Sequence, residues 1–309
     1  MLWLAVGVAA SALGSALALE QRPAGCGTSP LPGGTSAQTL EFGGRVREFQ
    51  VHVPERYDPA ALTPLVLYFV GWGGSGNVGF LADNADQNTY IAVAPTGVGG
   101  GNNPDGVLIN SWNGGGSTTS PGPQGPSCAP GSAQYCYTSC AARPQGCHPC
   151  DWTTCTDDFA FVDGLLDWLE ANLCIDPARI FALGHSNGGQ FVWALPSRLA
   201  SGRLAAIVPM AGTPHTGFGE GPFEASGPVS VMDVHGTNDV ICPPNSTEPS
   251  RDGWYYEQVP IMCDIFSRAD GCDPEFLAHY PTSFDHQQEL CENIPHFCLV
   301  AGGLCCLLH

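Results

Sequence analysis

The chain contains the segment Arg179-Ile180-Phe181-Ala182-Leu183-Gly184-His185-Ser186-Asn187-Gly188-Gly189, in which an apolar run ends at a serine between small residues. The apolar half predicts a buried strand, and residues 190–200 can form the helix that follows it. A strand that turns directly into a helix strains the backbone at the turn, and glycines on either side permit that strain because they lack a side chain. We therefore expect Ser186 to be presented at the turn as a nucleophile. Pro196 is expected to kink the following helix because it lacks a backbone donor.

The segments around this turn predict an α/β fold, with a mostly parallel central sheet and helices on both faces. Residues 39–54 alternate in polarity around Gly43-Gly44, which indicates a hairpin. Residues 159–173 carry apolar side chains at helical spacing, with acidic residues on the opposite side. Short apolar runs predict the remaining strands at 65–70, 90–94, 204–210, 229–234 and 296–301. Strands that alternate with helices in this way are typical of parallel sheets.

The amino terminus is similar to a cleaved secretion signal. Residues 1–18 are apolar, contain no acidic residue and end in the small-x-small pattern Ala16-Leu17-Ala18. A membrane anchor is the alternative, but the run is short for a span and no other stretch is apolar enough to cross a bilayer. We expect residues 19–309 to form a single catalytic domain, secreted and free of the membrane once the signal is removed.

The charge of the chain limits its partners. Its formal net charge is −19, and all ten basic residues are arginine. Nucleic acid and anionic membranes are therefore excluded as expected partners.

Fifteen cysteines in a chain with an export signal predict a disulfide framework rather than catalytic thiols. Six of them lie in residues 97–156, an irregular stretch rich in Gly, Pro, Ser and Asn that we expect to form a cysteine-rich insertion over the carboxyl edge of the sheet. The Cys147-His148-Pro149-Cys150 pair could belong to a zinc site, but export favours disulfides. The odd count leaves one thiol free or intermolecular. A glycosylation acceptor occurs at Asn245-Ser246-Thr247.

A serine hydroxyl needs a histidine base and, in most such sites, a carboxylate that orients the imidazole. In this fold the chain order is nucleophile, acid, histidine, and the acid lies just beyond a later strand. Asp239 occupies that place after the strand at 229–234. Asp233 is the rival, but it lies inside the strand.

The oxyanion of an acyl-transfer intermediate requires two backbone donors, one after the nucleophile and one from the loop after an early strand. Asn187 follows the serine and is expected to supply the first. The glycine-rich loop Val70-Gly71-Trp72-Gly73-Gly74-Ser75 follows a predicted strand directly, and Trp72 is the expected second donor. A simple glycine-rich turn is the alternative.

Three blocks, 65–75, 184–189 and 235–239, resemble secreted esterases of the feruloyl esterase and polyhydroxybutyrate depolymerase-like family, an α/β-hydrolase group. The resemblance covers residues 39–301 apart from the insertion. It implies an α/β-hydrolase fold and hydrolysis of carboxylic esters through an acyl-enzyme, with no metal and no organic cofactor. Members usually carry a histidine where this chain has Val70. This departure concerns the positioning of the loop, because the hydrogen bond to the oxyanion is donated by the backbone.

The catalytic histidine is the second departure from this pattern. His185 lies within the turn, where we expect its side chain to pack nearby. His296 begins the last predicted strand and would lie at the wrong edge of the sheet if that strand were parallel to its neighbours. His215 and His235 both precede Asp239, against the usual chain order.

The candidate base that remains is His309. The family has a glycine-rich turn ending in the catalytic histidine, whereas this chain reads Ala301-Gly302-Gly303-Leu304-Cys305-Cys306-Leu307-Leu308-His309. His309 could fold back if Cys305 or Cys306 is bridged by a disulfide. The alternative is a truncated or altered end at which His309 is frayed.

The sequence therefore predicts a secreted serine esterase that acts on an ester-bearing polysaccharide, with feruloyl or acetyl esters of plant or algal polysaccharides as substrates. A polyester such as polyhydroxyalkanoate is the neighbouring substrate. A catalytically silent relative that binds polysaccharide is the alternative, and the intact serine turn argues against a purely structural cysteine-rich protein. Trp72, Trp112 and Trp152 could line a pocket for an aromatic acyl group or a sugar face, or could belong to ordinary packing. The sequence predicts no oligomeric state.

Overall fold

The computed structural model describes residues 23–28, 30–100, 109–200, 202–218, 228–269, 296–301 and 304–308. The predicted signal at residues 1–18 and the candidate base His309 lie outside these described residues. Within the described part of the chain, no helix is long and apolar enough to cross a bilayer.

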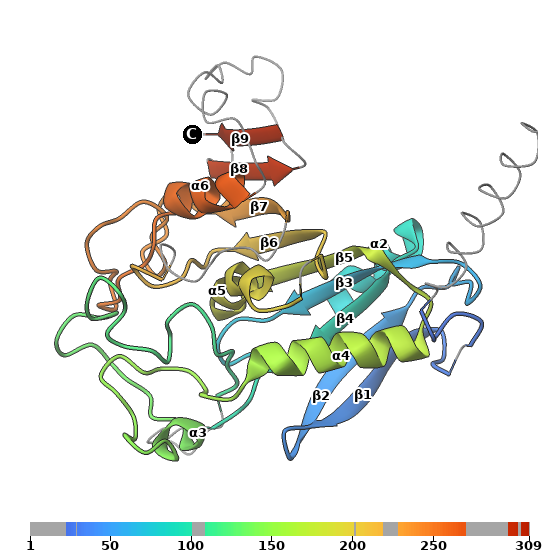
Figure 1. Ribbon diagram of the computed structural model, residues 1–309, viewed down its shortest axis with the longest axis horizontal. Coiled ribbons are helices and arrows are strands. Elements are labelled where there is room, and N and C mark those ends of the chain that lie inside the picture. Colours follow the sequence, from blue (N-terminus) through green and yellow to red (C-terminus); the bar gives the residue numbers. More distant parts are fainter. Residues whose placement is uncertain are drawn as a thin grey trace, which may run out of the picture.

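The described strands form one sheet in the order β1-β2-β4-β3-β5-β6-β7-β8-β9 (Figure 1). The central strands β4, β3, β5, β6 and β7 are parallel to one another, whereas β1, β2, β8 and β9 add antiparallel pairs at the two edges. The strands are β1 (Gly34–Phe42), β2 (Arg45–Val53), β3 (Thr63–Phe69), β4 (Ile91–Pro95), β5 (Ile175–His185), β6 (Ala206–Met210), β7 (Ser230–His235), β8 (His296–Ala301) and β9 (Leu304–Leu308).

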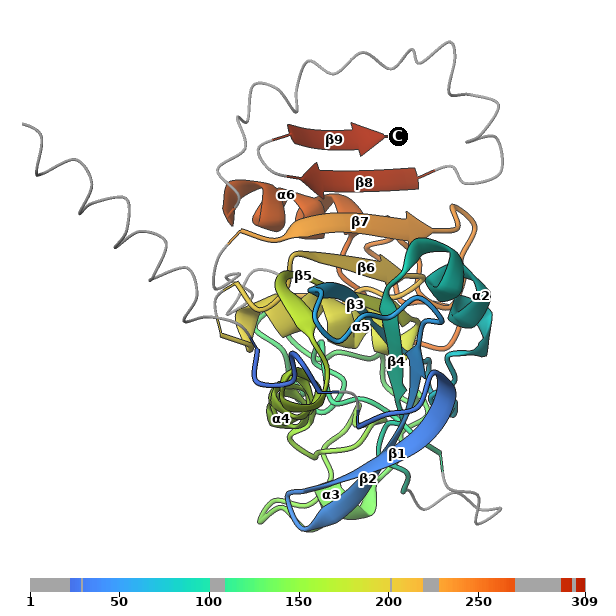
Figure 2. The same cartoon turned by 90° about the vertical axis from the view of Figure 1, so that its right-hand side faces the viewer.

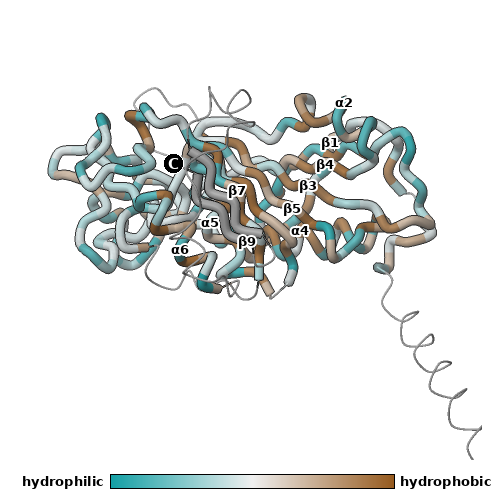
Figure 3. The backbone as a smooth tube through the Cα atoms, turned by 90° about the horizontal axis from the view of Figure 1, so that it is seen from above, coloured by the Kyte–Doolittle hydropathy of each residue, from teal (hydrophilic) through white to brown (hydrophobic). Residues whose placement is uncertain are grey.

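Helices cover both faces of the sheet, as the sequence predicts. Helix α2 lies on one face and α4, α5 and α6 lie on the other (Figure 2). Alternation along β3 produces this division: Leu65, Leu67 and Phe69 belong to the large core beneath α4, α5 and α6, while Val66 and Tyr68 pack with α2. Figure 3 shows the resulting apolar band along the central strands. The helices are α2 (Gly79–Asn88), α3 (Thr138–Ala141), α4 (Asp158–Asn172), α5 (Asn187–Ala194) and α6 (Val259–Ala269), with a 3-10 turn η1 (Leu195–Ser197).

The predicted strands, the hairpin and the helix at 159–173 are all present, with shifted ends. Helix α5 gives way to the 3-10 turn that contains Pro196, as expected from its missing backbone donor. The short helices α2 and α6 and the final strand β9 were not predicted.

The direction of β8 overturns one step of the sequence argument. Strand β8 runs antiparallel to β7, and the Cα of His296 is paired with that of His235. The exclusion of His296 on the ground that it lies at the wrong edge of the sheet is therefore wrong. Strand β9 reverses again, so that Leu308 is paired with Phe297 and β9 also ends at the carboxyl edge.

The segment between β4 and α4 is held by disulfides. Three lie within it: Cys128–Cys150, Cys136–Cys147 and Cys140–Cys155. Cys147 and Cys150 thus belong to different disulfides, which confirms the disulfide interpretation over a zinc site.

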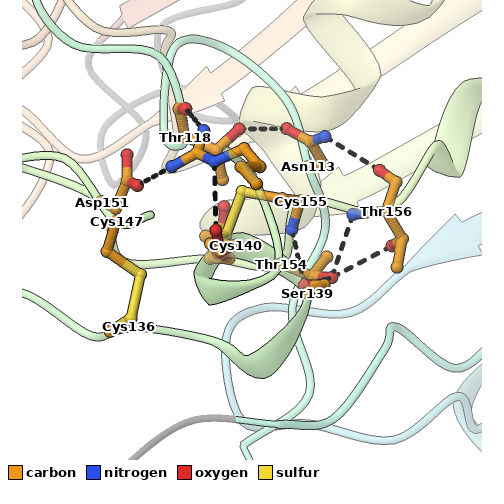
Figure 4. The surroundings of a disulfide bond; sticks show 12 residues. Asn113, Thr118, Cys136, Ser139, Cys140, Cys147, Asp151, Thr154, Cys155 and Thr156 are labelled. Carbon is orange, nitrogen blue, oxygen red and sulfur yellow. Dashed lines mark hydrogen bonds and ion pairs between the residues drawn. A yellow bond between two sulfur atoms is a disulfide. The ribbon is translucent and has the colours of Figure 1, made fainter. Parts of the chain in front are cut away.

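Hydrogen bonds around these disulfides tie separate parts of the segment together (Figure 4). Asn113 Nδ2 donates to the carbonyl oxygen of Thr156 at 2.8 Å, and Thr118 Oγ1 donates to Asn113 Oδ1 at 2.5 Å. The amide of Cys155 donates to Ser139 Oγ at 3.0 Å.

A buried ion pair joins this segment to the sheet and to α4. Arg47 on β2 and Asp158 at the start of α4 are 5% and 0% exposed, and their Nη2 and Oδ1 atoms lie 2.9 Å apart. The guanidinium also lies 3.8 Å from the ring centroid of Phe161, and Asp158 Oδ2 accepts from the amide of Asn113 at 2.9 Å. Burial raises the pKa of Asp158 and lowers that of Arg47, while their mutual attraction opposes both shifts.

Replacing Arg47 by methionine should leave the Asp158 carboxylate buried without its cation. We expect Arg47→Met to lower the free energy of unfolding by about 3–5 kcal/mol, because the penalty of an unpaired buried charge exceeds the lost attraction. Urea unfolding of the oxidised protein measures this change. The matched control is Arg251→Met, which breaks the exposed pair with Asp252 and should leave the midpoint unchanged. Equal losses in the two variants would contradict the interpretation.

Candidate active site

Ser186 lies at a sharp turn between β5 and α5. Its φ of 53° and ψ of −119° are rarely adopted by residues other than glycine. A Cβ on Gly184 would lie 2.2 Å from the Gly188 carbonyl oxygen, and a Cβ on Gly188 would lie 2.0 Å from the Phe69 carbonyl oxygen. A Cβ on Gly212 would lie 2.1 Å from the carbonyl oxygen of Ser186 itself. The turn therefore requires glycine at three positions around the serine.

The strained residue is held by hydrogen bonds and remains accessible. The amide of Ser186 donates to the Met210 carbonyl oxygen at 2.8 Å, and its carbonyl oxygen accepts from Gln190 at 3.0 Å. Ser186 is half-buried. The neighbouring His185 is exposed rather than packed, contrary to expectation. Among the described residues, no imidazole hydrogen-bonds to the Ser186 hydroxyl.

The two expected oxyanion donors lie on segments that border Ser186. Asn187 is the first residue of α5, and the loop after β3 comes so close that a Cβ on Gly71 would lie 3.2 Å from the Ser186 Cβ. The next two amides of that loop are already used, because Gly73 donates to Asn110 and Gly74 donates to Gly71. In the part of the chain that the structure describes, the amides of Trp72 and Asn187 have no acceptor.

Asp239 lies in a tight turn after β7. Its Oδ1 accepts from the amides of Ile241 and Cys242 at 2.8 and 3.0 Å, which leaves Oδ2 free of backbone donors. Strands β5, β6 and β7 end at the same level, since the Ser186 amide bonds to the end of β6 and the Ala211 amide bonds to Val234 at the end of β7. Nucleophile and candidate acid therefore follow strands two apart at the same edge of the sheet.

His235 is fully buried beneath this turn and supports it. Its Nε2 lies 2.8 Å from the Cys242 carbonyl oxygen and 3.8 Å from Asp239 Oδ2, and its Nδ1 lies 3.5 Å from Asp233 Oδ2. Burial lowers the pKa of His235, but the hydrogen bond and charge of Asp233 outweigh it, and the net shift is upward. Asp233, the rival acid, is thus engaged inside the strand with His235.

His215 uses both ring nitrogens in the protein interior. Its Nδ1 donates to the Tyr255 carbonyl oxygen at 2.7 Å, and its Nε2 accepts from Trp152 Nε1 at 3.0 Å. Burial lowers the pKa of His215 to about 4, so the ring is neutral near pH 7. This histidine holds Trp152 and has no nitrogen left to act as a base.

The three tryptophans singled out in the sequence have different roles. Trp112 is fully buried and stacks on Phe191, so it belongs to the core. Trp72 and Trp152 are half-buried and their ring centroids lie 6.4 Å apart. Trp72 is fixed by its Nε1, which donates to the hydroxyl of buried Tyr137 at 3.0 Å. Of the three tryptophans, Trp72 and Trp152 are the two whose side chains are partly exposed.

Two elements of the site were not predicted from the sequence. One is the double hydrogen bond between the Asn187 side chain and the backbone of Trp112. The other is the support of the Asp239 turn by His235. The first joins residues that are 75 positions apart, which no local sequence pattern signals. The second lies within residues 235–242, where the sequence argument considered His235 only as a candidate base.

The sheet order, the helices on both faces and the strained serine between β5 and α5 together define an α/β-hydrolase fold. Within this class the chain is similar to feruloyl esterases. It is 29% identical to feruloyl esterase C of Emericella nidulans over 118 residues, which are 38% of this chain and 37% of that protein. It is 36% identical to a bifunctional acetylxylan esterase/xylanase of Neocallimastix patriciarum over 86 residues, or 28% of this chain and 12% of the other. No family model matches the chain.

Solved structures align at lower identity. An acetyl xylan esterase from Aspergillus awamori is 12% identical with a TM-score of 0.47, covering 88% of this chain and 92% of the other. A poly(3-hydroxybutyrate) depolymerase from Bordetella parapertussis is 20% identical with a TM-score of 0.45, covering 78% and 79%.

The buried His215 should make the protein less stable in acid. Between pH 6.5 and about 4 the unfolded chain binds a proton at this ring that the folded chain does not, so the free energy of unfolding falls as the pH falls. The shift corresponds to about 3 kcal/mol over that window. Urea unfolding at pH 7.5 and pH 4 measures how much free energy of unfolding each protein loses in acid. The loss should be smaller by this amount in His215→Gln than in wild type, because glutamine does not titrate. Equal acid losses in the two proteins would rule out the assigned neutral state.

Proposed function

We propose that this protein is a secreted serine carboxylic ester hydrolase that acts through an acyl-enzyme. The observation that carries the proposal is the strained, half-buried Ser186 beside the amides of Trp72 and Asn187, neither of which has an acceptor among the described residues. A backbone strained in this way persists only where surrounding structure enforces it, and such strain clusters at reactive sites.

In the proposed mechanism the Ser186 oxygen attacks the ester carbonyl carbon while the base accepts the hydroxyl proton. The amides of Trp72 and Asn187 donate to the oxyanion of the tetrahedral intermediate. Collapse of the intermediate breaks the bond to the leaving alcohol, which takes the proton back from the base. Water then attacks the acyl-serine by the same sequence, releasing the carboxylic acid and restoring the serine.

Asp239 and His309 complete the proposed triad. Oδ2 of Asp239, which accepts from no backbone amide among the described residues, would orient the imidazole and stabilise its charged form. Sheet geometry sets the requirement for His309: β9 is four strands from β5, or roughly 19 Å at the usual strand spacing. The base must therefore extend inward over β8, β7 and β6 to reach Ser186. His296, at the start of β8, is one strand nearer and is the rival base.

The proposed substrates are feruloyl or acetyl esters of polysaccharides. Relatives named as feruloyl esterase C and acetylxylan esterase/xylanase support this class, and a polyester remains the neighbouring possibility. Trp72 follows Gly71, which borders Ser186, and the half-buried rings of Trp72 and Trp152 offer flat apolar faces that suit an aromatic acyl group or a sugar ring. The four disulfides that join pairs of described residues support secretion, because such bonds persist in oxidising compartments.

A second candidate function is binding of polysaccharide without catalysis. The observation that favours it is that no imidazole among the described residues bonds to the Ser186 hydroxyl. The two functions differ in covalent chemistry at that oxygen, which a labelling experiment detects.

Wild type should hydrolyse p-nitrophenyl acetate and be labelled covalently by a p-nitrophenyl phosphonate. Ser186→Ala should lose labelling completely and turnover by at least about 10³-fold, because the nucleophile is absent. The control Ser197→Ala removes a hydroxyl beyond the same helix, one that bonds only to the Ala194 carbonyl oxygen, and should keep full activity. Folded, oxidised wild type that neither labels nor turns over would support the binding function instead.

Substituting each candidate histidine tests the base. We expect His309→Ala to lower kcat by about 10²–10⁴-fold, the usual contribution of a general base, while His296→Ala stays near wild type. The pH profile of kcat/KM should lose its acidic limb in the variant that lacks the base. The reverse pattern would transfer the role to His296.

A further inference from the structure

Trp112 is bound on three sides by the segments that form the proposed oxyanion hole. Its indole Nε1 donates to the Val70 carbonyl oxygen at 2.9 Å. Its backbone amide donates to Asn187 Oδ1 at 2.7 Å, and its carbonyl oxygen accepts from Asn187 Nδ2 at 3.1 Å. The residue is 0% exposed, so these bonds form without competition from water.

Residues 110–112 fix the loop after β3 on both sides of Trp72, its proposed oxyanion donor. Trp112 Nε1 holds the carbonyl of Val70, and the carbonyl of Asn110 accepts from the Gly73 amide at 2.7 Å. Gly71 and Trp72 lie between these two anchors. The direction of the Trp72 amide is thus determined by residues 110–112.

The Asn187 side chain fixes the other donor to the same segment. Asn187 is 1% exposed, and its amide group pairs with both backbone polar groups of Trp112. The position of its own backbone N–H is therefore fixed by a side chain that is buried against Trp112. The ring of Trp112 adds contact, since it stacks on Phe191 of α5 at 5.3 Å and meets Phe69 of β3 edge-on at 5.1 Å.

We propose that Trp112 is a positioning residue that sets the separation and direction of the two oxyanion donors, Trp72 and Asn187. The inference rests on the proposed function, because it assigns a purpose to the geometry of that site. Donors must lie 2.7–3.1 Å from the oxyanion, and a displacement of about 1 Å costs roughly 10²-fold in rate. Trp112 prevents such displacement because its buried indole bonds to the loop after β3 while its backbone bonds to Asn187.

The test compares two buried tryptophans. Trp112→Phe removes the indole N–H and keeps an aromatic ring between Phe69 and Phe191. Trp193→Phe is the matched control: Trp193 is also fully buried, but its Nε1 has no hydrogen-bond partner in the described part of the chain. With p-nitrophenyl acetate, Trp112→Phe should lower kcat roughly ten- to hundredfold with KM within about twofold, while Trp193→Phe keeps kcat within about twofold.

A second variant keeps the test decisive if Trp112→Phe does not fold. Asn187→Ala retains the backbone donor and removes only the side-chain pairing, so it too should lower kcat with little change in KM. The double variant should lose less than the product of the two single losses, because both substitutions release the same segment.

The outcomes separate this inference from the function on which it rests. Three outcomes would each overturn the positioning role while wild type remains an esterase. The first is an unchanged kcat in Trp112→Phe or in Asn187→Ala. The others are equal losses of kcat in Trp112→Phe and Trp193→Phe, or losses of kcat that multiply in the double variant. Wild type that neither turns over nor reacts with the phosphonate would remove the proposed function, and this inference with it.

Discussion

The close approach of backbone segments around Ser186 is the constraint on which the rest of the site depends. The carbonyl oxygens of Phe69, Gly188 and Ser186 come so near to neighbouring glycines that a single added Cβ would overlap with them. This crowding joins the end of β3 to the start of α5 and brings the loop after β3 beside the serine. A positive φ at a residue with a side chain costs of order 1–3 kcal/mol, and the packed core on both sides of the turn supplies that energy.

The cysteine-rich segment bonds directly to the segments around Ser186. Its residues 110–113 bond to the loop after β3, to the first residue of α5 and, through Asp158, to Arg47 on β2. Disulfides fix this segment while leaving it poor in regular secondary structure. An irregular segment can hold the backbone beside Ser186 in place when covalent and buried polar bonds limit its motion.

Much of the fold follows from sequence because periodicity and glycine placement are local signals. The strained turn at Ser186, the hairpin at Gly43-Gly44 and the helix α4 were all predicted from short segments. The direction of β8 and the partners of Trp112 could not be predicted, because they depend on contacts between distant residues. The site was predicted only as far as strand ends and chain order allow. Ser186, Trp72, Asn187 and Asp239 follow strands at one edge of the sheet, and His309 lies outside the described residues. The catalytic roles of all five residues remain predictions.

The disulfide Cys26–Cys174 has a consequence for the whole first half of the molecule. Its cysteines are 148 residues apart, so the bond closes a covalent ring that contains β1 to β4, the cysteine-rich segment and α4. Closing a ring of that size removes roughly 5 kcal/mol of chain entropy from the unfolded state at room temperature. A protease that cuts once inside the ring would also release no fragment, because both new ends stay tethered by the disulfide.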